Sequence, residues 1–565
     1  MNLLGSLHSL ISGVGPFFIL LGILIFVHEL GHFLVAKFFG VRVEVFSMGF
    51  GKRIFQYKKG DTNYCISLIP LGGYVKMFGD DPNAEVPVEE RKYAFLHKPI
   101  PQRFAIVLAG PLMNLFFAVF IFSAIAAIGE NVSGPWVGDI APQTEAYKAG
   151  FRSGDKVLSV NGEDTASWNM VQKAVEGSGG KVIQVKVERK GEAQPLAFEA
   201  SVGFGENENL FAAARQVGQI PGLTSESRST MIGISDTKSP AGAAGVPGIA
   251  YLSAVNGKKV HAWRDLDEVF KDAVKPGAGS VTLELQKDIE KPEGPDNVLS
   301  VNVKLPDNYS EQKDPVAALG IEPAELYIYS VKKDSPADHA GILAKDKVLR
   351  VGGEPVTAWN DVLNRVKNFD PSTDGMDFTV LRNGEEKTLH VKPEMTTIPP
   401  SKTGMEEHRY TIGIVSGFFP SGPEPVFYRL TNPADILHHG IVETGNWTEF
   451  VVYSLVRMFQ GEVSPKNLGG VITIGRVASQ SFAAGMTVFM RMMGLISINL
   501  FLLNLLPVPI LDGGHLVFYS IEAVKGAPLS MRKMEIAQQV GLMLLMFLMA
   551  FAFFNDITNL FTNRW

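Results

Sequence analysis

His28, Glu29 and His32 form a His-Glu-Leu-Gly-His motif inside an uninterrupted apolar stretch near the start of the chain. Residues four apart lie on one face of a helix, so His28 and His32 can bind a single Zn²⁺. Glu29 lies about 100° around the helix, where its carboxylate can take a proton from a metal-bound water. Each ionisable residue at bilayer depth costs about 2–3 kcal/mol, which argues against a chance match. The motif predicts a metal-dependent protease that works inside a membrane.

The metal motif must be positioned by membrane helices. Four apolar stretches are long enough to cross a bilayer and, apart from Glu29, contain no Asp, Glu, Lys or Arg. The sequence therefore predicts a polytopic α-helical membrane protein with four transmembrane helices and an inserted extracytoplasmic module. The predicted helices lie within residues 1–36, 104–128, 488–512 and 536–557, and the short connections are residues 37–103 and 513–535.

Basic residues predict the orientation of these helices. Residues 37–103 carry eleven Lys or Arg, and residues 513–535 include Lys525, Arg532 and Lys533, whereas the first fifteen residues have none. By the positive-inside rule both connections are cytoplasmic, and both termini face outward with the large central region. No basic segment precedes the first apolar stretch, so we expect that helix to be retained rather than cleaved as a signal peptide.

Composition argues against nucleic-acid binding and against stabilisation by disulfides. The chain has a net charge of -6, which argues against a nucleic-acid partner. Its one cysteine, Cys65, allows no intrachain disulfide, so the central region must fold by burying an ordinary apolar core.

The central region contains an internal repeat. Residues 146–168 recur as residues 337–359 with identical spacing, and a weaker copy occupies residues 241–263. Asp155 and Asp346 hold equivalent positions, where the middle copy has Ala250. Each copy predicts a small α/β unit, and a linker with an amphipathic helix follows the units. The predicted units are residues 129–222, 223–310 (degenerate) and 311–398, and the linker is residues 399–487.

These repeats resemble bacterial, circularly permuted PDZ domains. That family binds extended peptides, often C-termini, by adding a strand to a sheet edge. The alternative is that the units act as spacers or as a steric filter without a ligand of their own. The middle copy, which lacks the aspartate, is the one most expected to be silent.

Two histidines leave a zinc site short of one protein ligand, if the fourth position is kept for water. The third apolar stretch supplies Asp512, which follows Pro507 and Pro509 and precedes two glycines. The prolines bend the helix, so Asp512 can project into the bundle. Its alternative role is a capping residue at the membrane interface. We expect the nearby His515 to support the site without binding the metal, because a fourth protein ligand would exclude water.

Together, His-Glu-Leu-Gly-His, the Asn-x-x-Pro-x-Pro-x-Leu-Asp-Gly-Gly segment and the intervening repeats resemble the site-2 protease family of intramembrane zinc metalloproteases. Residues 109–114 and 71–77 resemble the branch of bacterial regulator-of-sigma-E proteases. Relatives have one or two PDZ domains, so the third copy is a departure. The resemblance implies that zinc is bound by His28, His32 and Asp512, that Glu29 is the catalytic acid and base, and that Asn504 holds or polarises the scissile carbonyl.

The resemblance also implies partners and a location. The substrates would be single-span proteins in the lipid bilayer of the bacterial inner membrane, cut after an earlier cleavage of their outer portion. The released product would be a regulator such as an anti-sigma factor, or a remnant signal peptide. The PDZ-like module and both termini would then be periplasmic, and the module would help to enforce the order of the two cuts.

The connection at residues 37–103 contains two apolar segments, residues 64–70 and 71–77, around a Pro/Gly turn. They predict a hairpin that returns toward the bilayer, and its edge could pair with an unwound substrate. The predicted substrate-binding residues are Gly72, Gly73, Tyr74 and Val75. The alternative for this segment is an ordinary cytoplasmic hairpin.

Two other functions remain possible for the chain as a whole. A membrane-anchored PDZ scaffold with a structural or vestigial zinc site would bind peptides without cutting them. The intact Glu29 argues against it, because a structural site needs no such carboxylate. A transporter is less well supported, since the membrane stretches show no internal repeat.

Overall fold

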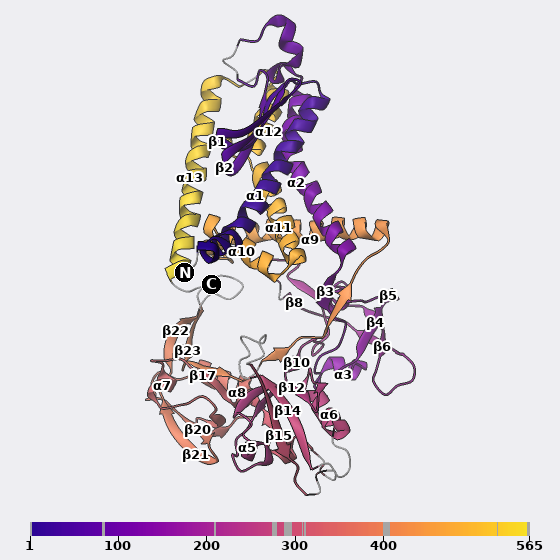
Figure 1. The fold of residues 1–565 in the computed structure, drawn as a ribbon, viewed down its shortest axis with the longest axis vertical. Coiled ribbons are helices and arrows are strands. Elements are labelled where there is room, and N and C mark those ends of the chain that lie inside the picture. The colour runs from indigo at the N-terminus through magenta and orange to yellow at the C-terminus, as the bar shows by residue number, and fades with distance from the viewer. Residues whose placement is uncertain are drawn as a thin grey trace.

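The computed structural model describes most of the chain: residues 3–81, 85–207, 209, 211–273, 279–286, 297–307, 309, 312, 314–398, 407–417, 419–527 and 529–561. Long helices and one small sheet occupy one end of the molecule, and three β-rich units form the other end (Figure 1). Two short segments, β3 (Glu130–Ser133) and β26 (Pro425–Tyr428), pair with each other where the two ends meet.

Four helices in the described part of the chain are long and apolar enough to cross a membrane, as predicted. They are α1 (Leu3–Phe38), α2 (Ile100–Ile128), α11 (Met486–Leu505) and α13 (Met531–Phe561). Helix α2 packs against both α1 and α11. Buried side chains such as Leu20, Phe122 and Ile498 form a common core between these three helices, whereas α13 lies to one side (Figure 1).

The third membrane helix ends earlier than the sequence predicted. Helix α11 stops at Leu505, and Asp512 is the first residue of a separate helix, α12 (Asp512–Lys525). The predicted helix over residues 488–512 is therefore wrong at its end, and the predicted loop over residues 513–535 contains α12 and the start of α13. Pro507 and Pro509 explain the break, because proline lacks a backbone N–H and forces the preceding residue out of helical geometry.

The sheet after α1 consists of β1 (Val43–Lys59) and β2 (Thr62–Met77). Phe46 pairs with both Tyr64 and Val75, so residues 43–48 lie between two segments of β2. The prediction that residues 64–70 pair directly with 71–77 is wrong. Gly49 and Gly51 have positive φ angles and let β1 turn back on itself, which creates the extra pairing. Residues 73–77 are left at an edge of the sheet, beside α1.

The first and third repeat units have the same sheet topology. Each has four antiparallel strands with a helix packed on one face, over a core of buried apolar residues. The first unit contains α3 (Glu145–Ala149), β4 (Lys156–Val160), β5 (Glu163–Asp164), α4 (Trp168–Glu176), β6 (Val182–Glu188), β7 (Leu196–Ser201), β8 (Gly203–Glu206) and β9 (Gln216–Gln219). The third contains β17 (Ile328–Val331), α7 (Pro336–His339), β18 (Lys347–Val351), β19 (Glu354–Pro355), α8 (Trp359–Lys367), β20 (Met376–Arg382), β21 (Glu385–Val391), β22 (Glu394–Ile398), β23 (Glu407–Thr411) and β24 (Ile414–Ser416).

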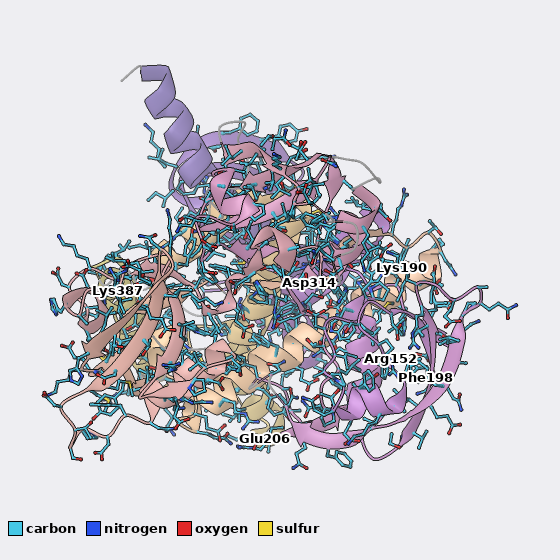
Figure 2. All side chains as sticks on the ribbon, turned by 90° about the horizontal axis from the view of Figure 1, so that it is seen from below. Arg152, Lys190, Phe198, Glu206, Asp314 and Lys387 are labelled. Atoms are coloured by element: carbon cyan, nitrogen blue, oxygen red, sulfur yellow. The ribbon has the colours of Figure 1, made fainter. Side chains whose placement is uncertain are left out.

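The middle unit has its own apolar core and a larger sheet. Its elements are β10 (Ser227–Arg228), β11 (Met231–Gly233), α5 (Pro240–Ala243), β12 (Ile249–Val255), β13 (Lys258–Lys259), α6 (Leu266–Ala273), β14 (Ser280–Gln286), β15 (Val298–Lys304) and β16 (Glu322–Pro323). Seen from the end of the module, the first and third units lie on opposite sides of the molecule, at Phe198 and Lys387 (Figure 2).

The repeated aspartate has a structural role. Asp155 accepts hydrogen bonds from the Arg189 side chain at 2.7 and 2.8 Å and from a backbone N–H at 2.8 Å. Asp346 makes the same contacts with Arg382 and with a backbone N–H. Both carboxylates therefore tie the turn after a short helix to a sheet strand. Ala250 cannot do so, which agrees with the weaker motif of the middle unit.

A second repeated contact shows where each unit ends. A glycine with positive φ packs against the Ser or Thr that caps the unit's first helix, and a Cβ on it would approach that residue to 2.3–2.5 Å. The pairs are Gly222 with Thr144, Gly320 with Ser239, and Gly413 with Ser335. The middle and third units therefore extend past their predicted ends at residues 310 and 398, and their last strands end at Pro323 and Ser416.

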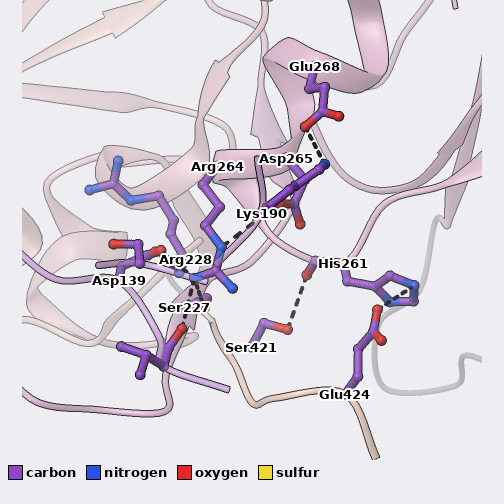
Figure 3. A network of polar contacts seen from close by, with 12 residues as sticks. Asp139, Lys190, Ser227, Arg228, His261, Arg264, Asp265, Glu268, Ser421 and Glu424 are labelled. Carbon is purple, nitrogen blue, oxygen red and sulfur yellow. Dashed lines mark hydrogen bonds and ion pairs between the residues drawn. The ribbon is translucent and has the colours of Figure 1, made fainter. Parts of the chain in front are cut away.

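Polar contacts join the first and middle units. Arg264 donates to Asp139 at 3.0 Å and to the Ser227 hydroxyl at 2.9 Å, and Lys190 forms an ion pair with Glu268 (Figure 3). Lys190, Ser227 and Arg264 line a cavity of about 570 Å³, together with the returning residues 421–424. The first and middle units are thus in direct contact.

Helix α9 (Pro433–Phe459) lies across the base of α2, in the segment where an amphipathic helix was predicted (Figure 1). The first unit contacts it: the Phe211 and Phe450 rings are 5.0 Å apart, and Lys173 forms an ion pair with Glu443 at 3.2 Å. A further helix, α10 (Val471–Ala484), precedes α11 and contacts α1. The module is thus attached to the membrane helices by the β3–β26 ribbon and by α9.

Candidate metal centre

Three ligand atoms meet where α1 faces the start of α12. The Nε2 atoms of His28 and His32 are 3.3 Å apart, and Oδ2 of Asp512 lies 3.2 Å from the first and 3.6 Å from the second. Ligands at about 2.0–2.1 Å from a tetrahedral zinc ion would be about 3.3–3.4 Å from one another. The three side chains therefore already have the spacing of a zinc site, with the fourth position free for water or substrate.

Helix α2 holds His32 in place. The Nδ1 atom of His32 donates to the backbone carbonyl of Ile106 at 2.9 Å, which leaves the lone pair on Nε2 for a metal. Gly110 provides the space for the ring, because a Cβ there would lie 2.2 Å from Nε2. A second glycine allows α1 and α2 to pack closely, because a Cβ on Gly31 would lie 2.3 Å from the carbonyl oxygen of Ala109.

Glu29 lies between the ligands and the edge of the β1–β2 sheet. Its carboxylate accepts a hydrogen bond from the backbone N–H of Val75. A Cβ on Gly73 would lie 3.0 Å from Cγ of Glu29, so glycine allows the strand to approach this side chain. The carboxylate is thus within the site, next to the edge predicted to bind substrate.

A cavity of about 1120 Å³ opens beside the three ligands. Its walls include Glu29 and three of the four predicted substrate-binding residues, Gly73, Tyr74 and Val75. The fourth, Gly72, packs on the Phe50 ring instead. Asn504 lies in the last turn of α11 and is not among the described residues that line the cavity. The structure thus places Asn504 outside the group of residues that it brings together.

Helix α12, which carries Asp512, is fastened to α2. The guanidinium of Arg103 donates to both carboxylate oxygens of Glu522, at 2.7 and 3.2 Å, and both side chains are largely buried. The same guanidinium lies 4.9 Å from the centre of the Tyr519 ring, and burial raises the pKa of that phenol to about 12. His515 lines the cavity and packs edge-on against Phe518, outside the group of three ligands.

The supporting residues on α2 were not identified from the sequence. Ile106 acts through its backbone carbonyl, so its side chain gives no signal. Asn114 and Arg103 do leave one, because buried polar residues within or beside an apolar stretch usually have a partner. Asn114 is fully buried and lies 3.2 Å from His28.

The chain is similar to known proteins over almost its whole length. A model of Peptidase family M50 matches residues 16–548. The Regulator of sigma-E protease RseP of Escherichia coli (strain K12) is 30% identical over 557 residues, which cover 98% of this chain and 100% of the relative. The Regulator of sigma E protease of Salmonella typhimurium (strain LT2) is 29% identical over the same shares of both chains. Among solved structures, a PDZ domain protein from Parabacteroides distasonis is 10% identical and covers 50% of this chain and 95% of its own. Its TM-score of 0.14 is too low to support an argument.

Proposed function

Because the chain belongs to Peptidase family M50, we propose that it is a zinc-dependent endopeptidase that cuts membrane-spanning segments of single-span proteins. The resemblance to site-2 proteases is confirmed by this family match and by the full-length similarity to regulator-of-sigma-E proteases. The observation that carries the proposal is the meeting of His28, His32, Asp512 and Glu29 at a cavity between membrane helices.

We propose that His28, His32 and Asp512 hold the zinc ion. The donor set supports this assignment, since two imidazoles and one carboxylate with one open position are typical of catalytic zinc. When bound, zinc would polarise the scissile carbonyl and lower the pKa of a water molecule. Glu29 then takes the proton from the attacking water and passes it to the nitrogen of the leaving amine.

The β1–β2 edge positions the substrate in this proposal. A transmembrane helix has its carbonyls hydrogen-bonded internally, so it must unwind before a peptide bond can reach Glu29. Residues 73–77 offer an edge on which the unwound segment can form a strand. Asn504 as a holder of the scissile carbonyl stays a prediction, because it is not among the described residues that line the cavity.

The proposed orientation follows from the basic connections. Residues 37–103 and 513–535 face the cytoplasm of a bacterial inner membrane, and the repeat module and both termini face the periplasm. The metal centre then lies toward the cytoplasmic side of α1. The product is released there, for example an anti-sigma factor or a remnant signal peptide, after an earlier cut outside.

The repeat units act on the other side, as peptide-binding sites or as a filter against bulky outer domains. The contacts between the first and middle units and between the first unit and α9 support a filter, because they hold the module close to the membrane helices. A scaffold without protease activity would bind peptides equally well with and without zinc.

Glu29→Gln tests the proposal in the purified full-length protein. The variant should hold one zinc per chain like the wild type and should no longer cut a single-span substrate whose outer portion has been trimmed. Glu145→Gln, an exposed change in the first repeat unit, is the matched control and should cut normally. Undiminished cleavage by Glu29→Gln would refute the assignment of Glu29. Peptide binding without cleavage by the wild type would favour the scaffold.

A further inference from the structure

Asn114 is the buried polar residue that most needs an explanation. It lies on α2 inside a membrane-spanning segment, and its side chain is 0% exposed. One end of its amide is 3.2 Å from Nδ1 of His28, while the Oδ1 atom at the other end has no hydrogen-bond partner in the described part of the chain. A buried amide of this kind costs stability unless it serves a partner.

The chemistry of His28 decides which amide atom faces it. A neutral imidazole that binds zinc through Nε2 carries its proton on Nδ1, so Nδ1 is a donor. The amide nitrogen of Asn114 is also a donor and cannot serve it, whereas the amide oxygen can accept. The Oδ1 atom makes no other hydrogen bond, so rotating the amide by 180° changes only its contact with His28.

We propose that Asn114 is a positioning residue: its Oδ1 accepts a hydrogen bond from Nδ1–H of His28 and so fixes the tautomer that presents Nε2 to zinc. This inference rests on the proposed zinc site. It assigns to a third helix a role that the motif on α1 and the aspartate on α12 do not include.

The rest of the α2 face supports this role. Ile106 accepts from Nδ1 of His32, Gly110 makes room for that ring, and Asn114 faces Nδ1 of His28. These three residues are four apart, so they lie on one face of the helix. Asn114 is itself held in place, because its backbone carbonyl accepts the Ser497 hydroxyl of α11 at 2.7 Å. One helix thus sets the ring orientation of both histidines.

Two substitutions of Asn114 separate hydrogen-bond acceptance from packing. Asn114→Leu keeps the size of the side chain and removes both polar atoms. Asn114→Asp keeps an oxygen that accepts and removes the nitrogen. Zinc per chain is measured in the purified full-length protein after exposure to graded concentrations of a chelator. We expect Asn114→Leu to weaken zinc binding by about 10- to 100-fold, and Asn114→Asp to hold zinc within a few-fold of the wild type.

Thr444→Val is the matched control, since it removes a buried hydroxyl contact within α9 and touches neither Asn114 nor His28. It should hold zinc like the wild type. Thermal unfolding of the zinc-free proteins shows whether each variant is folded.

The inference is overturned if Asn114→Asp loses zinc as readily as Asn114→Leu, because the amide nitrogen or packing would then matter instead. It is also overturned if Asn114→Leu retains zinc fully. Should Asn114→Leu not fold, zinc loss by folded Asn114→Asp alone overturns it and retention supports it. Failure of the proposed function would give another result: the wild type itself would hold no zinc, or His28→Ala would retain it.

Discussion

Gly110→Ala should remove zinc from the protein without unfolding it. The added Cβ would lie 2.2 Å from Nε2 of His32 and 2.5 Å from Cε1, whereas ordinary contacts begin at 3.4 Å. The ring must therefore move by 3.4 − 2.2 = 1.2 Å. A zinc–nitrogen bond is only about 2.0–2.1 Å long, so a shift of this size breaks it.

The expected loss of cleavage activity is at least about 100-fold, the effect of a 1 Å misplacement in an active site. The stability of the Gly110→Ala variant, in contrast, should not fall. Alanine favours a helix interior over glycine by about 0.5–1 kcal/mol, and the clash is with the movable end of a side chain rather than with backbone. The melting temperature of the zinc-free variant should therefore equal or exceed that of the zinc-free wild type.

Zinc content, cleavage of a trimmed single-span substrate and thermal unfolding measure these three effects. Gly22→Ala is the matched control, because Gly22 is also in a membrane helix and a Cβ there meets nothing within 4 Å. It should keep both zinc and activity. If Gly110→Ala holds zinc and cuts like the wild type, then His32 does not bind the metal in this orientation, and the reasoning fails.

Three further predictions concern the packing around the site and in the module. Asp155→Ala should lower the free energy of unfolding of the first repeat unit by about 2 kcal/mol, measured by denaturant titration, because a charge-assisted contact is lost. Arg103→Ala leaves Glu522 as an unpaired, largely buried charge and should cost about 3 kcal/mol of stability, measured by thermal unfolding of the whole chain. The hydrogen bond with Asp377 raises the pKa of His390, so this pair stabilises the fold at low pH and loses its effect as pH rises through that pKa. NMR titration should show the pKa of His390 falling in Asp377→Asn, and an unchanged value would contradict the assigned contact.

The sequence could single out the three candidate metal ligands because their chemistry is local. The His28 and His32 spacing depends only on helical geometry, and Asp512 stood out as a carboxylate within an apolar region. The end of α11 was harder to place. Apolar residues continue past Leu505 to Leu511, and only the prolines mark the break. Hydrophobicity therefore extended the predicted helix to a residue that in fact begins the next one.

Strand pairing could not be derived in the same way. Residues 64–70 and 71–77 are both apolar, and nothing in either segment indicates that residues 43–48 pair between them. The signal was in β1 itself, where Gly49 and Gly51 permit the turn. The ends of the repeat units were predicted wrongly for a similar reason. Each end is marked by a glycine that packs on a helix cap far away in the sequence, and the sequence does not show that contact.

Contacts made by backbone atoms are even harder to predict from the sequence. Ile106 holds His32 through a carbonyl that any residue at that position would possess. Asn114 could have been identified, since an amide in the middle of an apolar helix requires a partner. Its partner could not, because the distance between α1 and α2 depends on Gly31 and Gly110 packing closely.

The position of the β1–β2 edge explains why an extended substrate suits this site. Val75 donates its N–H to Glu29, and Gly73 has no side chain to keep the strand away from that carboxylate. A peptide paired alongside residues 73–77 would therefore run past Glu29 and the three metal ligands, with its peptide groups exposed. A helix at the same place would present side chains and carbonyls that are already hydrogen-bonded. The geometry thus favours substrates whose membrane segment unwinds readily, so helix-breaking residues near the scissile bond should raise the cleavage rate.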